Sequence, residues 1–590
     1  MARDAGPADA RLDLSAIDFP ADVDTMTAFN DRMDGIWLVG WMGDMNHYRQ
    51  RWCVLLHLLQ GRGHDHVAAA NKIGCLAPYR VSGRATSRSS PIDWHRRGVP
   101  CDSLMAANRP LSRLATGSQS VLRLRWWLVT GLFVLGLLLR LPMLGGPHRE
   151  GDEVIYRSLV GQLEQGHGYS LQKSVLVERG IIDRYQYDRP LFHHPPGGIA
   201  LFWLSRQAFG ESGLPLVQLF SFSLFFWSMM LLAHALGVSK SDVGLFLVAL
   251  LSSFNPIMAH VTTKYWLDAP LLAFASFGAA LFMVSFVKKR TAPVARIAAQ
   301  RPAKRSKLSS SGQRVTRRAG QNSPDGRPAG RRYTLLAIAA GAIIGYASLI
   351  KLTALVVLPC VFLLCLALTP PLKWKSLLLH GLCFVIPALV VQAPWELWQW
   401  AVVGSPFPQW AGKPSAALVE SNSYVHFLTV VRSPWVYLTL TPMVMTTILP
   451  SLVLLVLFYL PAEKPESLLS ETPSGSEVAR GFLSTSSARA SATACLLWLF
   501  VVIAFHIALG FAGYSKLLRY IILATPASIL LPALLAPYAW ETLSNKGSLV
   551  RMLRLPVMIC LAVGTVAEVA AGISAAFHVQ RALIAPFIGL

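Results

Sequence analysis

Long apolar runs recur along most of the chain, separated by shorter polar segments. Each run holds roughly 17 to 25 residues, close to the ~20 that a helix needs to cross a bilayer. The alternating segments of about ten residues that mark a membrane barrel are absent from the pattern. The pattern predicts an all-α integral membrane protein with about eleven transmembrane helices, at approximately 122–144, 214–237, 243–261, 268–287, 333–350, 352–369, 377–393, 435–460, 491–511, 519–537 and 555–577.

The composition agrees with this fold class. Of the 590 residues, 53% are hydrophobic and 14% are charged, and the mean hydropathy is +0.45, which excludes an ordinary soluble protein. The eight cysteines show neither zinc-ligand spacing nor a disulfide framework. Residues 1–115 contain no spanning run and no secretory signal, so we expect a poorly ordered cytoplasmic extension, with Met105 as an alternative start. The transmembrane domain is then expected over 120–590.

The distribution of positive charge predicts the orientation of the helices. The net charge is +23, and residues 288–332 hold fourteen Lys or Arg against a single Asp. Cytoplasmic connections of membrane proteins are rich in Lys and Arg, which favours a basic, disordered cytoplasmic loop here over an RNA- or lipid-binding segment. Because basic residues also precede the first run, the N-terminus is predicted to be cytoplasmic.

One short apolar segment, His194–Phe209, decides this topology. If it crossed the membrane, the basic loop would lie outside, so we interpret it as a juxtamembrane helix on the outer face. The outer face then receives the first outer loop at 145–212, the polar residues 262–268, the outer loop 394–434 and residues 513–520.

Acidic, basic and aromatic side chains gather at these outer ends. The motif GDEVIY places Asp152 and Glu153 just after the first run, and carboxylates in apolar surroundings persist where they pair, bind a cation or transfer a proton. Independent helix anchors would have no need to converge on one membrane face. The other candidates on this face are Arg157, Tyr187, His193, His194, Lys264, Asp268, Lys351, Lys516, Arg519 and Tyr520.

These motifs, in order, resemble glycosyltransferase family 39. The similarity rests on GDEVIY after the first run, HHPPGG before a short apolar helix, the Asp of KYWLDAPL, the Lys of SLIKLTAL and the late KLLRY. That family contains the dolichyl-phosphate-mannose protein mannosyltransferases and the lipid A aminoarabinose transferase. The resemblance covers about residues 120–540 and implies a bundle of GT-C type.

The resemblance implies inverting transfer of a sugar from a polyprenyl-phosphate donor to an acceptor outside the cytoplasm, by a multi-pass protein of the plasma (inner) membrane whose active site is extracytoplasmic. Such a reaction needs a base for the acceptor hydroxyl and cations for the departing phosphate. Matched to the family, Asp152 is the expected base, Glu153 a neighbour that positions substrate or tunes the base, and Asp268 a second acid. Lys264, Lys351, Lys516 and Arg519 are expected at the phosphate, and Arg157 is a weaker candidate.

The sequence departs from the family at the turn before the short helix. His193 and His194 stand where the aminoarabinose transferases tend to have Glu and Lys, so a metal role for this turn is left open and no divalent metal is required by the sequence. The acceptor is a protein, a lipid or a glycan, and no nucleic-acid partner is expected. A transporter or lipid flippase is the alternative, although such proteins tend to show internal repeats, which this sequence lacks.

Overall fold

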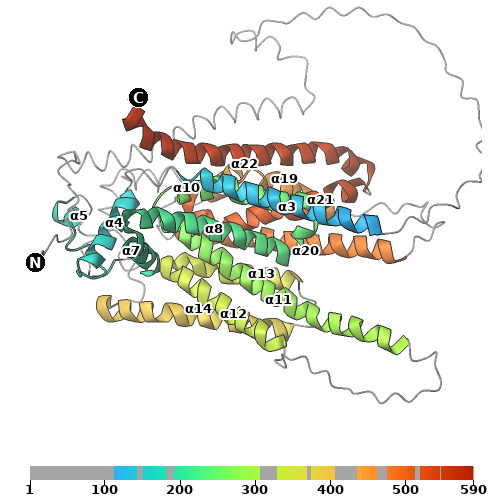
Figure 1. Ribbon diagram of the computed structural model, residues 1–590, viewed down its shortest axis with the longest axis horizontal. Helices are drawn as coiled ribbons and strands as arrows, with labels where there is room; N and C mark the ends of the chain where they lie inside the picture. The colour runs from blue at the N-terminus through green and yellow to red at the C-terminus, as the bar shows by residue number, and fades with distance from the viewer. Residues whose placement is uncertain are drawn as a thin grey trace, which may run out of the picture. The chain divides into compact units, whose positions relative to one another are not determined.

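The computed structural model describes residues 112–141, 151–180, 190–192, 194–305, 329–368, 374–404, 435–460, 475–511, 518–544 and 546–588 (Figure 1). The chain divides into two units, Met1–Leu122 and Arg123–Leu590. All contacts given below lie within the second unit. Residues 1–111 of the expected cytoplasmic extension lie outside the described residues, and helix α3 begins at Ser112.

Every described element is helical. The α-helices are α3 (Ser112–Leu138), α4 (Gly151–Glu164), α5 (Val175–Glu178), α7 (Gly197–Phe209), α8 (Gly213–Ala235), α9 (Asp242–Phe254), α10 (Pro256–Thr262), α11 (Asp268–Arg305), α12 (Ala329–Ile350), α13 (Val357–Leu368), α14 (Trp374–Val403), α18 (Val436–Val444), α19 (Ile448–Tyr459), α20 (Gly475–Phe511), α21 (Thr525–Ser544) and α22 (Ser548–Ile588). Short 3-10 turns stand at η4 (Gly210–Ser212), η5 (Val238–Lys240), η7 (Leu352–Val356) and η11 (Leu518–Ala524).

The all-α membrane fold expected from the apolar runs is confirmed. Within the described residues, eight helical stretches are long and apolar enough to cross a membrane, and three shorter apolar helices lie at Arg125–Leu138, Leu352–Leu368 and Ile448–Tyr459. Each of the eleven expected spans overlaps one of these stretches. Hydropathy alone therefore located the helices, because the bilayer demands apolar side chains along nearly the whole crossing.

The helix ends differ from the expected ones. Helix α11 continues to Arg305, so helix covers the first part of the range 288–332 that was expected to be disordered. Likewise α14 continues to Val403, into the expected outer loop 394–434, and α20 begins at Gly475, well before its apolar run. Residues 288–305 contain many strong helix formers, Ala, Arg, Lys and Gln, together with Pro293 and Pro302, and the helix continues through them beyond the end of the apolar run.

The stretch Gly197–Ala235 is divided by a sharp turn. Helix α7 has 13 residues, about 20 Å at the helical rise and short of the ~30 Å hydrocarbon core. Gly210 has φ +61° at the end of α7, and a side chain at Gly213 would collide with the carbonyl of Ser205. The Ser205 hydroxyl donates to the Gly213 carbonyl at 2.8 Å, so α7 folds back against the start of α8. A separate short helix is thus present where a juxtamembrane helix was predicted, and its position on the outer face stays a prediction.

Close helix packing surrounds α11 and α12. Helix α11 packs against α8 and α12, and α12 packs against α14. An added Cβ at Gly345 would lie 2.6 Å from the Ala388 carbonyl of α14, and one at Gly278 would lie 2.8 Å from Ile344 of α12. Small residues at such contacts allow helix backbones to approach closely in a bilayer. These contacts bring the end of α12 beside the start of α11.

Candidate active site

Buried charged residues lie in and around the segment between α10 and α11. Within it, Lys264 is 3% exposed, and Asp268, at the first position of α11, is 1% exposed. Lys351, just after α12, donates to both carboxylate oxygens of Asp268 at 2.9 and 3.0 Å. The two residues lie 83 positions apart in the sequence and form a buried ion pair between the ends of α11 and α12.

Glu153 ties the same segment to α4. Its side chain is 1% exposed, and Oε1 accepts a hydrogen bond from the backbone N–H of Tyr265 at 2.8 Å. Glu153 stands in the first turn of α4, where the helix dipole stabilises a negative charge. This carboxylate therefore fixes the backbone three residues before Asp268.

Asp152 precedes Glu153 in the first turn of α4 and is half-buried. Adjacent residues of an α-helix point about 100° apart, so Asp152 and Glu153 face different directions. The Glu153 side chain is buried, whereas the Asp152 side chain keeps access to solvent.

Lys264 has an aromatic neighbour. Its ammonium lies 4.3 Å from the centre of the Trp266 ring, a cation–π contact. The Trp266 ring also meets His260 edge-on at 5.1 Å, and its carbonyl accepts from the Gln218 amide at 2.9 Å. These contacts hold the 263–267 segment against α8 and α10.

The HPPGG turn packs onto the residues next to the ion pair. A Cβ at Gly197 would lie 2.9 Å from Leu349, and one at Gly198 would lie 2.5 Å from Leu267. Leu349 and Leu267 are close in the chain to Lys351 and Asp268. At Gly197 the neighbour is the backbone of Leu349, so this position needs glycine for the start of α7 to reach the end of α12, whereas at Gly198 the neighbour is the end of the Leu267 side chain.

Two tyrosines secure this turn. The Tyr169 hydroxyl donates to the carbonyls of His194 and Pro195 at 2.9 and 3.1 Å, and the Tyr346 hydroxyl donates to the Gly197 carbonyl at 3.0 Å. Burial raises the pKa of Tyr169 well above its usual value, so the phenol remains a donor. The His194 ring itself lies 6.3 Å from the Tyr156 ring.

Burial also raises the pKa of Tyr265 well above its usual value. The charges of Glu153 and Glu211 raise it further, and Arg157 opposes them. Tyr265 thus stays protonated near neutral pH and is unsuited to act as a base.

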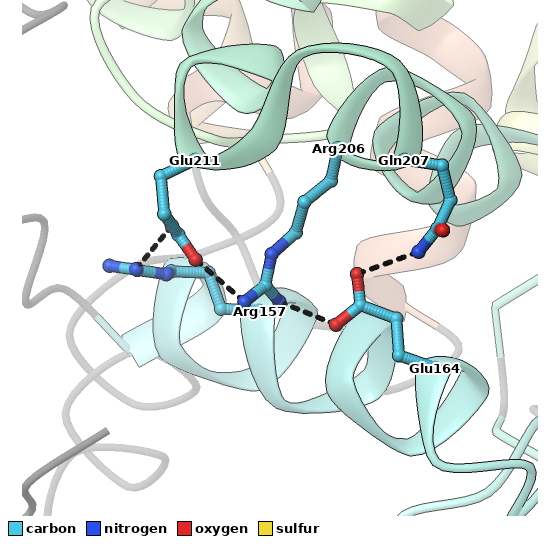
Figure 2. A network of polar contacts seen from close by, with 5 residues as sticks. All are labelled: Arg157, Glu164, Arg206, Gln207 and Glu211. Carbon is cyan, nitrogen blue, oxygen red and sulfur yellow. Dashed lines mark hydrogen bonds and ion pairs between the residues drawn. The ribbon is translucent and has the colours of Figure 1, made fainter. Parts of the chain in front are cut away.

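Arg157 lies in a different environment, an exposed network between α4 and α7 (Figure 2). It contacts Glu211 at 2.7 Å, while Arg206 contacts Glu211 at 2.6 Å and Glu164 at 3.1 Å. Gln207 adds a hydrogen bond to Glu164 at 3.1 Å. The Arg157 guanidinium is thus paired with the Glu211 carboxylate of η4.

The remaining predicted residues are not placed with their side chains. Tyr187, His193 and Lys516 lie outside the described residues. Arg519 and Tyr520 fall within η11, whose backbone packs against α10 and α11. Among the residues that the structure describes, no group of three His, Cys, Asp or Glu side chains could hold a metal ion.

Sequence reasoning missed a buried arginine next to the site. Arg140 is 0% exposed and donates from Nε to Thr262 Oγ1 at 2.7 Å and from Nη1 to the carbonyls of Gly136 and Ser253 at 2.6 and 3.2 Å. Its guanidinium also lies 3.8 Å from the centre of the Phe222 ring. Arg140, just after α3, thereby joins the end of α3 to α9 and to the last residue of α10. A charged residue inside an apolar run was the available signal.

The geometry provides a half-buried carboxylate, Asp152, next in the chain to Glu153, which belongs to a cluster of buried charges. Such a setting suits proton abstraction by the first group and stabilisation of a developing anion by the others. It is built from α4, the start of α7, the start of α11 and the end of α12.

No family model matches the chain, and no curated protein matches it. Solved structures match in outline. The chain is 16% identical to ArnT from Cupriavidus metallidurans bound to undecaprenyl phosphate, with a TM-score of 0.41 and coverage of 79% of this chain and 80% of that chain. It is 13% identical to the oligosaccharyltransferase AglB from Archaeoglobus fulgidus in complex with an inhibitory peptide and a dolichol-phosphate, with a TM-score of 0.34 and coverage of 76% and 56%.

With TM-scores below 0.5, these matches are a likeness in outline only, and the function proposed below is derived from the residues of the site.

Proposed function

We propose that this protein is a membrane glycosyltransferase that moves a sugar from a polyprenyl-phosphate donor to an acceptor on the extracytoplasmic face of the plasma membrane. One observation carries the proposal. Four of the charged residues singled out from the motifs, Glu153, Lys264, Asp268 and Lys351, are buried in or beside the 263–267 segment, with the HPPGG turn against the same helix ends. Helix anchors spread over separate loops would not require this convergence.

In the proposed reaction, Asp152 takes the proton of the acceptor hydroxyl. The acceptor oxygen then forms a bond to the anomeric carbon of the donor, and the bond from that carbon to the phosphate oxygen breaks, with its electron pair leaving on the phosphate. Attack from the opposite side inverts the anomeric centre. The half-buried position of Asp152 supports this role, since the base must be reached by an incoming acceptor.

The departing phosphate gains negative charge and needs a cationic partner. Lys264 supports this role through its position in the buried segment, and Arg519 is proposed beside it because η11 packs against α10 and α11. Lys516, which lies outside the described residues, is proposed at the phosphate from its sequence motif alone. Lys351 is bound by Asp268, so the pair is close to neutral as a unit and is proposed to hold the site together.

One observation favours a transporter or flippase instead. The break between α9 and α10 at Asn255 and the break before α19 at Thr447 meet at the buried carboxylate of Glu568 on α22, with hydrogen bonds of 3.0 and 2.9 Å. Interrupted helices that meet at a buried acid are typical of secondary transporters. The two candidates differ in whether the bond between sugar and phosphate is broken.

The deciding experiment follows that bond. The purified protein in lipid nanodiscs would be given undecaprenyl phosphate carrying a radiolabelled hexose or aminopentose, with a membrane extract as the source of acceptor. We expect label to leave the lipid for the acceptor and undecaprenyl phosphate to be released. Label that stays on the lipid with every sugar offered, combined with movement of that lipid between leaflets in proteoliposomes, would establish the transporter instead.

A further inference from the structure

Helix α14 carries a polar stripe along an otherwise apolar helix. Gln392, Trp395 and Gln399 are 3%, 4% and 1% exposed, and Glu396 lies among them at helical spacing. The opposite face is apolar and open, with Leu397 61% and Trp400 59% exposed. The polar groups thus turn inward and the apolar ones outward, as expected for a helix that faces lipid on one side and a polar interior on the other.

The stripe lies beside the candidate active site. The Ser348 hydroxyl of α12 donates to Gln392 Oε1 at 2.7 Å, and Ser348 is one helical turn before Lys351. On the other side, the Trp395 ring meets the Tyr169 ring edge-on at 5.7 Å, and the Tyr169 hydroxyl holds the His194 carbonyl of the HPPGG turn.

Glu396 is held in place and retains acceptor capacity. Gln392 Nε2 donates to Glu396 Oε1 at 2.5 Å, which fixes the carboxylate. Glu396 Oε2 is buried as an atom and has no hydrogen-bond partner among the residues that the structure describes. A buried carboxylate oxygen without a donor is costly, and a ligand that supplies hydroxyl donors would remove that cost.

We propose that Glu396, positioned by Gln392 and flanked by Trp395, binds the hydroxyl groups of the sugar carried by the polyprenyl-phosphate donor. This inference rests on the proposed glycosyltransferase function. A carboxylate accepts hydrogen bonds from sugar hydroxyls in a charge-assisted way, and the buried Trp395 ring, packed on Tyr169, holds this part of α14 beside the HPPGG turn. The phosphate is recognised at the cationic residues, and α14 recognises the sugar.

A structural role for the stripe makes a different prediction. Polar side chains also join helices within membranes, and Gln392 does contact α12 through Ser348. If Glu396 served only this role, its replacement would lower stability and would affect every ligand equally.

The test compares a lipid with and without its sugar. Binding of bare undecaprenyl phosphate and of undecaprenyl phosphate carrying mannose or glucose would be measured by calorimetry for the wild type, Glu396→Gln and Leu397→Ala, a control on the lipid-facing side. For the sugar that the wild type transfers, we expect Glu396→Gln to weaken binding of the sugar-bearing lipid about tenfold and to leave the bare lipid within about twofold. Leu397→Ala should change neither, and Glu396→Gln should keep the wild-type melting temperature.

Equal affinity of Glu396→Gln and the wild type for the sugar-bearing lipid would overturn this inference while the proposed function stands. Equal weakening for both lipids, or a fall in melting temperature, would assign the stripe to helix packing and overturn it as well. A wild type that transfers no sugar at all would instead remove the proposed function, and the inference with it.

Discussion

Two sets of charges, the Asp268–Lys351 pair and the network of Figure 2, differ in how they are held. Asp268 and Lys351 form a pair whose side chains are 2% and 10% exposed, whereas Arg206 and Glu211 form a pair of similar length at 21% and 54% exposure. An exposed pair is screened by water and salt, while a buried one has replaced its hydration with its partner. The distance between the charged atoms therefore does not separate the two pairs, but their burial does. Asp268 and Lys351 are buried in the candidate site, whereas the network of Figure 2 is open to solvent.

The largest effect in this comparison should follow from breaking the buried pair. Lys351→Met would leave the Asp268 carboxylate buried without its cation, which should lower the free energy of unfolding by about 3–5 kcal/mol. Chemical denaturation in micelles would measure it, with Lys375→Met, at an exposed lysine of α14, as the matched control.

The double variant Asp268→Leu, Lys351→Met separates stability from chemistry. Replacing both charges by apolar groups should restore most of the lost stability but not sugar transfer, because the site would lack both groups. If Lys351→Met alone were as stable as the control Lys375→Met, the buried pair would contribute no more to stability than an exposed one.

A smaller effect is expected at Glu153. Glu153→Met would leave the buried N–H of Tyr265 without its acceptor, at a cost of about 1–3 kcal/mol, whereas Glu153→Gln keeps an acceptor oxygen and should lose less than half of that. Unfolding of the two variants under the same conditions gives the comparison. Equal losses for both would mean that the negative charge, and not the hydrogen bond, is what holds the segment.

The smallest effect should come from the exposed network of Figure 2. Arg206→Gln removes contacts to Glu164 and Glu211, yet it should lower the free energy of unfolding by about 1 kcal/mol or less. This loss should be smaller still in 1 M salt, because salt screens charges that are open to solvent. If Arg206→Gln lowered the free energy of unfolding as much as Lys351→Met, burial would not explain the difference between the two pairs.

The sequence predicted the helices well and the partners of their charged residues poorly. Apolar runs located every span because the bilayer imposes its length on each helix separately. The helix ends were predicted less well, as at α11, because polar residues with high helix propensity continue the helix beyond the membrane.

The site was predicted as a set of residues at helix ends and not as a set of contacts. Asp268 and Lys351 were expected at one face, but their pairing depends on the close packing of α11 on α12, which small residues permit. The bond from Glu153 to Tyr265 and the clamp by Arg140 join residues more than 100 positions apart. Contacts across such separations follow from tertiary packing, which the local pattern does not encode.

In the proposed reaction, Asp152 is the base that takes the proton of the acceptor hydroxyl. The most direct measurement is the rate of label transfer from a polyprenyl-phosphate sugar by Asp152→Asn, alongside donor binding and melting temperature. The Asn side chain keeps the size of Asp but lacks its basicity, so transfer should fall by about 100-fold or more, while binding and melting temperature stay at wild-type values. Transfer at the wild-type rate by a folded Asp152→Asn variant would contradict the account.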